Sequence, residues 1–107
     1  LESDAGGFTP RGFSFDTSEK EFKSIKKFEE LFKDYGMNNF FLGGSGADIG
    51  PLKDGLVILA GLRPDSQRYF DVHHAASDTF DKINKRELEL GAAAMASLIY
   101  LMDNYKL

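Results

Sequence analysis

The stretch Leu56-Val57-Ile58-Leu59-Ala60-Gly61-Leu62 is apolar throughout, which predicts a central β-strand covered on both faces. Three other stretches are expected to complete the sheet: the end of a strand at 1–4, a short alternating strand at 13–15 and a buried strand at 39–42. A further β-type run at 69–72 leads directly into the only two histidines of the chain.

Two long helices are predicted between and after these strands. The first begins at a capping box headed by Ser18, carries aromatic side chains at three- and four-residue steps, and ends at Gly36. The second begins at Asn84, with Glu87 at its third position, and runs to about Tyr105. Its predicted apolar stripe consists of Leu88, Met95, Leu98, Ile99 and Met102. The pattern predicts a three-layer α/β/α fold with a mixed, mostly parallel sheet of about three to four strands.

Composition excludes several classes of function. The 107 residues suit one domain or part of one. A formal net charge of −4 argues against nucleic acid as a partner, because binding phosphates requires a clustered basic surface. The chain has no cysteine, so it forms no disulfide and no thiolate metal site. No apolar run reaches the length of a membrane span.

The residues with chemical potential gather around the histidine pair. His73 and His74 would lie at the end of a sheet, where α/β proteins collect ligands, and Asp78 follows His74 by four positions. Asp78 could orient an imidazole or its loop, as carboxylates do behind metal-bound histidines. From the residues alone, packing and hydrogen bonding explain such a histidine pair more often than metal ligation does. Asp4, placed before a flexible Ala-Gly-Gly turn, is either a metal ligand or a loop aspartate bonded to its own backbone.

The glycine-rich loop at 43–50 invites comparison with phosphate-binding loops. It has no Gly-Lys-Ser/Thr ending, and Ile49 stands where a dinucleotide motif requires its third glycine. A phosphate cradle is therefore excluded. Asp48 at the end of this loop remains open between a role at a functional site and N-capping of the short turn that follows.

Three motifs resemble, in order and spacing, the C-terminal part of carboxypeptidase Q-like enzymes of the di-zinc aminopeptidase family. They are Glu2-Ser3-Asp4-Ala5-Gly6, Gly44-Ser45-Gly46-Ala47-Asp48-Ile49, and Tyr69-Phe70-Asp71-Val72-His73-His74 with Asp78-Thr79. The resemblance implies that Asp4 and His74 each ligate one of two zinc ions. It implies that Asp48, Tyr69, His73 and Asp78 lie near the metal centre without ligating it, and either support the ligands or contact the substrate. Tyr69 could equally cap a strand edge.

The family comparison also implies what lies outside this chain. In the family, a His-x-Asp motif and a Glu-Glu pair, which supply the other ligands and the general base, precede the ligand equivalent to Asp4. Residues 1–107 are therefore interpreted as the C-terminal portion of a zinc peptidase catalytic domain, with no catalytic base of their own. The whole enzyme would be a secreted or extracytoplasmic exopeptidase that hydrolyses peptides or dipeptides through a metal-bridging water, and the isolated portion would be inactive.

Two other expectations follow. The sheet should have an unpaired edge where the missing N-terminal part of the same chain belongs, and this edge would also allow a homo-oligomer to form. The alternative to a peptidase is a non-catalytic binding or structural α/β domain with a pseudo-active site. The sequence leaves open the choice between aminopeptidase, carboxypeptidase and dipeptidase specificity.

Overall fold

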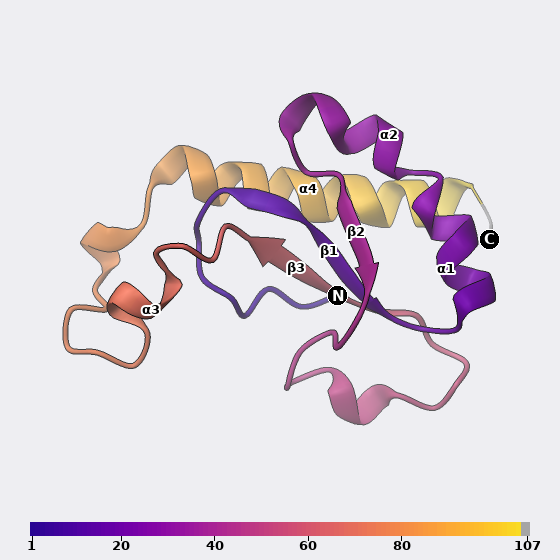
Figure 1. Cartoon of the computed structure of the whole chain (residues 1–107), viewed down its shortest axis with the longest axis horizontal. Coiled ribbons are helices and arrows are strands. Elements are labelled where there is room, and N and C mark those ends of the chain that lie inside the picture. The colour runs from indigo at the N-terminus through magenta and orange to yellow at the C-terminus, as the bar shows by residue number, and fades with distance from the viewer. Residues whose placement is uncertain (106–107) are drawn as a thin grey trace.

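A mixed β-sheet lies at the centre of the computed structural model, which describes residues 1–105 (Figure 1). Strand β1 (Pro10–Asp16) is flanked by β2 (Asn39–Leu42), which runs parallel to it, and by β3 (Leu59–Pro64), which runs antiparallel. Glu2 adds a parallel bridge to Gly61 on the outer side of β3. The predicted α/β class with a mixed sheet of three to four strands is confirmed.

One face of this sheet carries an aromatic core. Phe13 and Phe15 are fully buried on β1, and Phe13 makes an edge-to-face contact with Phe40 of β2, with ring centroids 5.7 Å apart. Alternate residues of a strand point to the same face, which explains why the two phenylalanines share this core. Three helices cover the face: α1 (Glu19–Lys26), α2 (Glu29–Phe32) and α4 (Lys85–Asn104).

The opposite face is covered by a loop. Ser14 of β1 points to this side, where its hydroxyl donates to the carbonyl oxygen of Gly44 at 2.6 Å. A Cβ on Gly61 of β3 would lie 2.1 Å from the carbonyl oxygen of Ser45. The loop backbone therefore approaches the sheet more closely than a helix could. Within residues 1–105 no helix forms the second outer layer of the predicted three-layer arrangement.

The first predicted helix is divided into shorter pieces. Ser18 caps α1 as expected, accepting the N–H of Glu21 at 3.2 Å. At the end of α1 the helical turn becomes tighter, because the N–H of Phe28 donates to the carbonyl oxygen of Ile25, three residues back. After α2, a 3-10 turn at Lys33–Tyr35 ends at Gly36, whose φ of 67° is the left-handed conformation predicted for this stop.

The apolar run at 56–62 begins its strand later than predicted, and β3 lies beside the central strand β1 instead of being the central strand itself. Leu56 is 87% exposed and β3 starts only at Leu59. The carboxylate of Asp54 accepts the N–H groups of Leu56 and Val57 at 2.8 and 3.2 Å. These bonds hold both residues in a turn, so their backbone groups do not join the sheet.

Helix α4 confirms the predicted C-terminal helix and its cap. Asn84 accepts the N–H of Glu87 at 3.1 Å. The helix meets the sheet through Gly91, Ala94 and Leu98, whereas Leu88 and Ile99 of the predicted stripe are more than half exposed. In the part of the chain that the structure describes, no helix is long and apolar enough to cross a membrane.

Candidate functional site

A cleft of about 500 Å³ brings together five of the six residues singled out in the sequence. Its walls come from the loop at 3–8, from helix α3 (Tyr69–Val72) with the turns that follow it, and from the region around the start of α4. The predicted site residues that line it are Asp4, Tyr69, His73, His74 and Asp78. The fold therefore brings the loop at 3–8 and the segment at 69–88 together in one concave surface.

A larger groove of about 720 Å³ lies between α2 and α4. The described residues that line it are apolar apart from Ser97 and the hydroxyls of Tyr35 and Tyr100, and they include no carboxylate or imidazole. Those two groups are common general bases and zinc ligands. The smaller cleft is accordingly the candidate functional site.

The histidines are presented by a helix and a chain reversal. The predicted β-run at 69–72 is wrong, because these residues form α3, where the N–H of His73 bonds the carbonyl oxygen of Tyr69 at 3.1 Å. This segment makes only local backbone bonds and has no neighbouring strand among the described residues, so β-propensity has no sheet to act on. His74 then adopts a left-handed conformation with φ 54°.

Three aromatic rings are in contact in this part of the cleft. His73 stacks on His74, with ring centroids 3.9 Å apart and an angle of 22° between the ring planes, and makes a tilted contact with Tyr69 at a centroid distance of 4.6 Å. Such contacts restrict the rotation of each ring. His73 is therefore placed to orient its neighbour His74, the more exposed of the two imidazoles.

Asp78 lines the cleft on a tight turn, with its N–H bonded to the carbonyl oxygen of Ala75 at 3.0 Å. In residues 1–105 no hydrogen bond joins its carboxylate to either imidazole. Further along, the hydroxyl of Thr79 donates to the carboxylate of Asp81 and holds the pKa of that group below its ordinary value. The turn thus fixes where Asp78 lies, without a direct link to His74.

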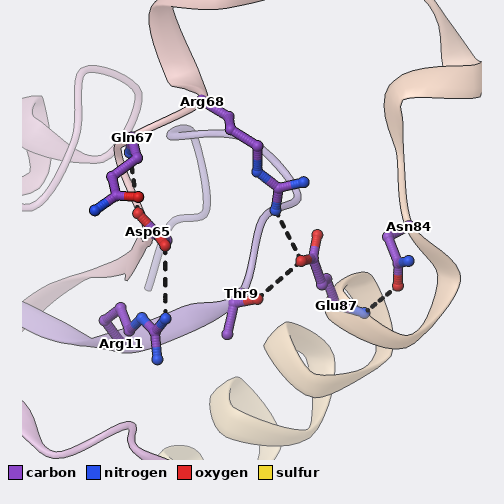
Figure 2. A network of polar contacts seen from close by, with 7 residues as sticks. All are labelled: Thr9, Arg11, Asp65, Gln67, Arg68, Asn84 and Glu87. Atoms are coloured by element: carbon purple, nitrogen blue, oxygen red, sulfur yellow. Dashed lines mark hydrogen bonds and ion pairs between the residues drawn. The ribbon is translucent and has the colours of Figure 1, made fainter.

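A polar network ties the walls of the cleft together (Figure 2). Oε1 of Glu87, in the first turn of α4, accepts the hydroxyl of Thr9 at 2.9 Å and Nη2 of Arg68 at 2.8 Å. The Arg68 guanidinium also lies 4.8 Å from the centre of the Phe8 ring, a cation–π contact. One carboxylate therefore connects the Asp4 side of the cleft, the residue before α3, and α4.

Asp65 supports the same region from the end of β3. Its carboxylate accepts the N–H of Gln67 at 3.0 Å and lies 3.5 Å from Nη2 of Arg11, as Figure 2 shows. The Gln67 hydrogen bond, followed by the interaction with Arg11, holds the pKa of Asp65 below its ordinary value. The chain between β3 and α3 is therefore fixed by charge-assisted bonds.

The sixth predicted residue, Asp48, is not among the residues that line this cleft. It lies on the glycine loop, and its N–H donates to Oε1 of Glu2 at 3.4 Å. The alternative role as a helix cap is wrong, because the short 3-10 helix at Gly50–Leu52 is preceded by Ile49 and has no side-chain cap.

Glu2 is the polar residue that the sequence analysis missed as an individual group. It is 9% exposed, although a glutamate is rarely buried without partners. The only local signal for a role is its position two residues before Asp4. In the strand predicted at 1–4, both side chains would point to the same face. Its partners lie 46 and 47 positions away, so the pairing itself has no sequence pattern.

The cleft offers donors that suit zinc. Carboxylate oxygen and imidazole nitrogen are both common zinc ligands, and Asp4, His73, His74 and Asp78 supply two of each. Among residues 1–105, however, no three such side chains lie close enough together to hold a metal ion. The donor set fits a zinc site that takes further ligands from elsewhere.

The amino-acid sequence of the chain is similar to those of known peptidases. No family model matches the chain. Carboxypeptidase Q from Mus musculus and from Homo sapiens are each 30% identical to it over 102 residues, which is 95% of the chain. The resemblance to carboxypeptidase Q-like peptidases is confirmed. The chain spans 22% of the length of these relatives.

The fold of the chain is also similar to that of a peptidase. The crystal structure of a peptidase M28 precursor from Shewanella amazonensis superposes with a TM-score of 0.82 and 28% sequence identity. The match covers 97% of this chain and 24% of the other. The α/β arrangement described above is therefore that of a segment of a peptidase M28 fold.

Proposed function

We propose that the chain is the C-terminal portion of the catalytic domain of a zinc-dependent exopeptidase that hydrolyses peptide bonds in peptides or dipeptides. The observation that supports it is the joint position of Asp4 and His74 in one cleft, in a chain similar to carboxypeptidase Q. The resemblance assigns one of these residues to each zinc ion. Following the same resemblance, we expect the whole protein to be extracytoplasmic.

The residues of this chain have separate tasks in that proposal. Asp4 and His74 supply an oxygen and a nitrogen donor, and His73 restrains the ring of His74 by stacking on it. Tyr69 contacts His73 with its ring tilted, and the turn that carries Asp78 shapes the adjoining wall. When bound, zinc would activate a water and polarise the scissile carbonyl group. Asp48 would orient substrate or support the site from the glycine loop.

A non-catalytic binding or structural domain is the second candidate. The finding that favours it is the lack of three clustered metal-ligating side chains among residues 1–105. A catalytic zinc usually keeps three protein ligands. We therefore expect the chain alone to bind zinc weakly and to hydrolyse nothing, since the general base is also expected to lie elsewhere.

The test is a zinc titration of the 107-residue chain followed by NMR. We expect Zn²⁺ to shift the imidazole signals of His74, and Asp4→Ala and His74→Ala each to weaken binding, because each removes a proposed ligand. His73→Ala is the comparison variant and should weaken binding less than His74→Ala, because this ring is proposed to orient rather than to ligate.

Two results would contradict the proposal. One is a titration that neither Asp4→Ala nor His74→Ala affects, which would favour the structural domain. The other is chelator-sensitive cleavage of dipeptides by the purified chain, which would show that the chain contains a complete catalytic site.

A further inference from the structure

The buried carboxylate of Glu2 connects two segments that are far apart in the sequence. Its Oε2 accepts the N–H of Ile49 at 3.1 Å, and its Oε1 accepts the N–H of Asp48 at 3.4 Å. Its backbone is fixed as well, because its N–H bonds the carbonyl oxygen of Ala60 at 2.9 Å and its own carbonyl oxygen accepts the N–H of Leu62 at 2.8 Å. Glu2 is thus held by β3 while it holds the glycine loop.

Gly46 leaves the space that this carboxylate occupies. A Cβ built on Gly46 would lie 2.1 Å from Oε2 of Glu2, and the φ of this glycine is +149°. Both the backbone conformation and the contact exclude a side chain. The glycine at this position of the loop is therefore explained by Glu2.

The first half of the loop has a separate anchor. The carbonyl oxygen of Gly44 accepts the hydroxyl of Ser14 at 2.6 Å and Nη2 of Arg63 at 2.6 Å, and Nε of Arg63 donates to the same hydroxyl at 2.8 Å. These bonds fix the chain just after β2. The second half, which carries Asp48, is held by Glu2.

We propose that Glu2 is a positioning residue that locks the second half of the glycine loop to the segment carrying Asp4. Because Asp4 follows Glu2 by two residues, the lock sets the position of Asp48 relative to the proposed metal ligand. The significance for catalysis rests on the proposed function. The lock itself is a property of the chain without metal and can be tested there.

Amide hydrogen exchange measured by NMR on the 107-residue chain tests the lock. In Glu2→Ala we expect the amides of Asp48 and Ile49 to exchange about tenfold to a hundredfold faster, because each loses a bond to a charged acceptor. Amides in the ladder between β1 and β3 should keep their rates. Glu2→Gln keeps one carbonyl acceptor and should restore part of the protection.

The glycines of the loop provide a matched pair of variants. Gly46→Ala should reproduce the fast exchange at Asp48 and Ile49 with Glu2 intact, because its methyl group displaces the carboxylate. Gly44→Ala should leave the rates unchanged, since a Cβ at Gly44 meets nothing within 4 Å.

Unchanged exchange in Glu2→Ala would overturn the proposal, and so would equal effects of the two glycine variants. Faster exchange throughout the chain would also overturn it, because Glu2 would then stabilise the whole fold rather than position the loop. A failed zinc titration would contradict the peptidase proposal and leave these results unaffected.

Discussion

Replacing Glu87 by glutamine tests whether the polar network holds the cleft together. The side chain of Glu87 is 20% exposed, and a single oxygen accepts bonds from both Thr9 and Arg68. Glutamine has nearly the same size and a similar helix propensity, so the substitution changes mainly the charge. The bond from Thr9 becomes a neutral one, and the bond from Arg68 keeps its charged donor but loses the ion pair.

The magnitude follows from the two bonds. Hydrogen bonds to charged groups contribute about 1.5–3 kcal/mol and neutral ones about 0.5–1.5 kcal/mol, a difference of about 1 kcal/mol for the Thr9 bond, and loss of the exposed ion pair with Arg68 adds less than about 1 kcal/mol. The Arg68 side chain is 52% exposed, so solvent screening reduces its share. We expect Glu87→Gln to lower the free energy of unfolding by about 1–1.5 kcal/mol.

Urea unfolding followed by circular dichroism measures this loss. With a slope of about 1–1.5 kcal/mol per molar urea, the midpoint should fall by about 1 M and the slope should stay the same. Glu89→Gln is the control on the same helix, because within residues 1–105 Glu89 pairs only with Lys85, at 3.9 Å, and both side chains are largely exposed. Its effect should stay within about 0.5 kcal/mol. Equal effects of the two substitutions would refute the reasoning.

Two other predictions concern the core and the acid range. Leu98 is 1% exposed, so Leu98→Ala should lower the free energy of unfolding by about 2–5 kcal/mol. Ile99 is 57% exposed, so Ile99→Ala should lower it by less than about 1 kcal/mol. Similar losses for the two variants would contradict the assignment of the α4 face that packs on the sheet. The pKa of Asp65 is lowered in the folded state by its bonds to Gln67 and Arg11. Its stabilisation is therefore present above the unfolded pKa and is lost as pH falls through the folded pKa. Asp65→Asn should flatten the fall in stability below about pH 5, and an unchanged profile would rule out this contribution.

Local signals in the sequence predicted the parts of the fold that local chemistry determines. Ser18 and Asn84 cap their helices through their own side chains, and Gly36 ends a helix because glycine readily takes a positive φ. The strand at 39–42 was predicted with the bounds that the structure shows, but only Phe40 of it is buried, because β2 lies at the edge of the described sheet. Each of these features depends on residues within four positions of one another.

The errors occurred where distant contacts, or a single polar side chain, decide the structure. The Tyr-Phe-Asp-Val run has the composition of a strand, yet it forms α3 because it lies beside no strand among the described residues. Leu56 and Val57 are apolar, yet the carboxylate of Asp54 holds them in a turn. In both places the residues have a high β-propensity, but their surroundings prevent them from forming a strand.

In the candidate site, too, some residues were predictable from the sequence and others were not. Motif resemblance selected Asp4 and His74, and the fold places them in one cleft. The groups that hold the surrounding walls, Glu2 and Glu87, make their decisive contacts across 19 to 78 positions of sequence. No periodicity or motif reports such contacts.

These two carboxylates act on different parts of the molecule, and this separation bears on how the site would work. Glu87 fixes the cleft from α4, through Thr9 and Arg68. Glu2 fixes the glycine loop on the opposite face of the sheet, through Asp48 and Ile49. Asp4 follows Glu2 by two residues and precedes Thr9 by five, so it lies on the short segment between the two fixed points. If Asp4 is the ligand proposed above, this exposed residue is held at both ends of its segment and keeps its position before a metal binds, so less ordering entropy is lost on binding.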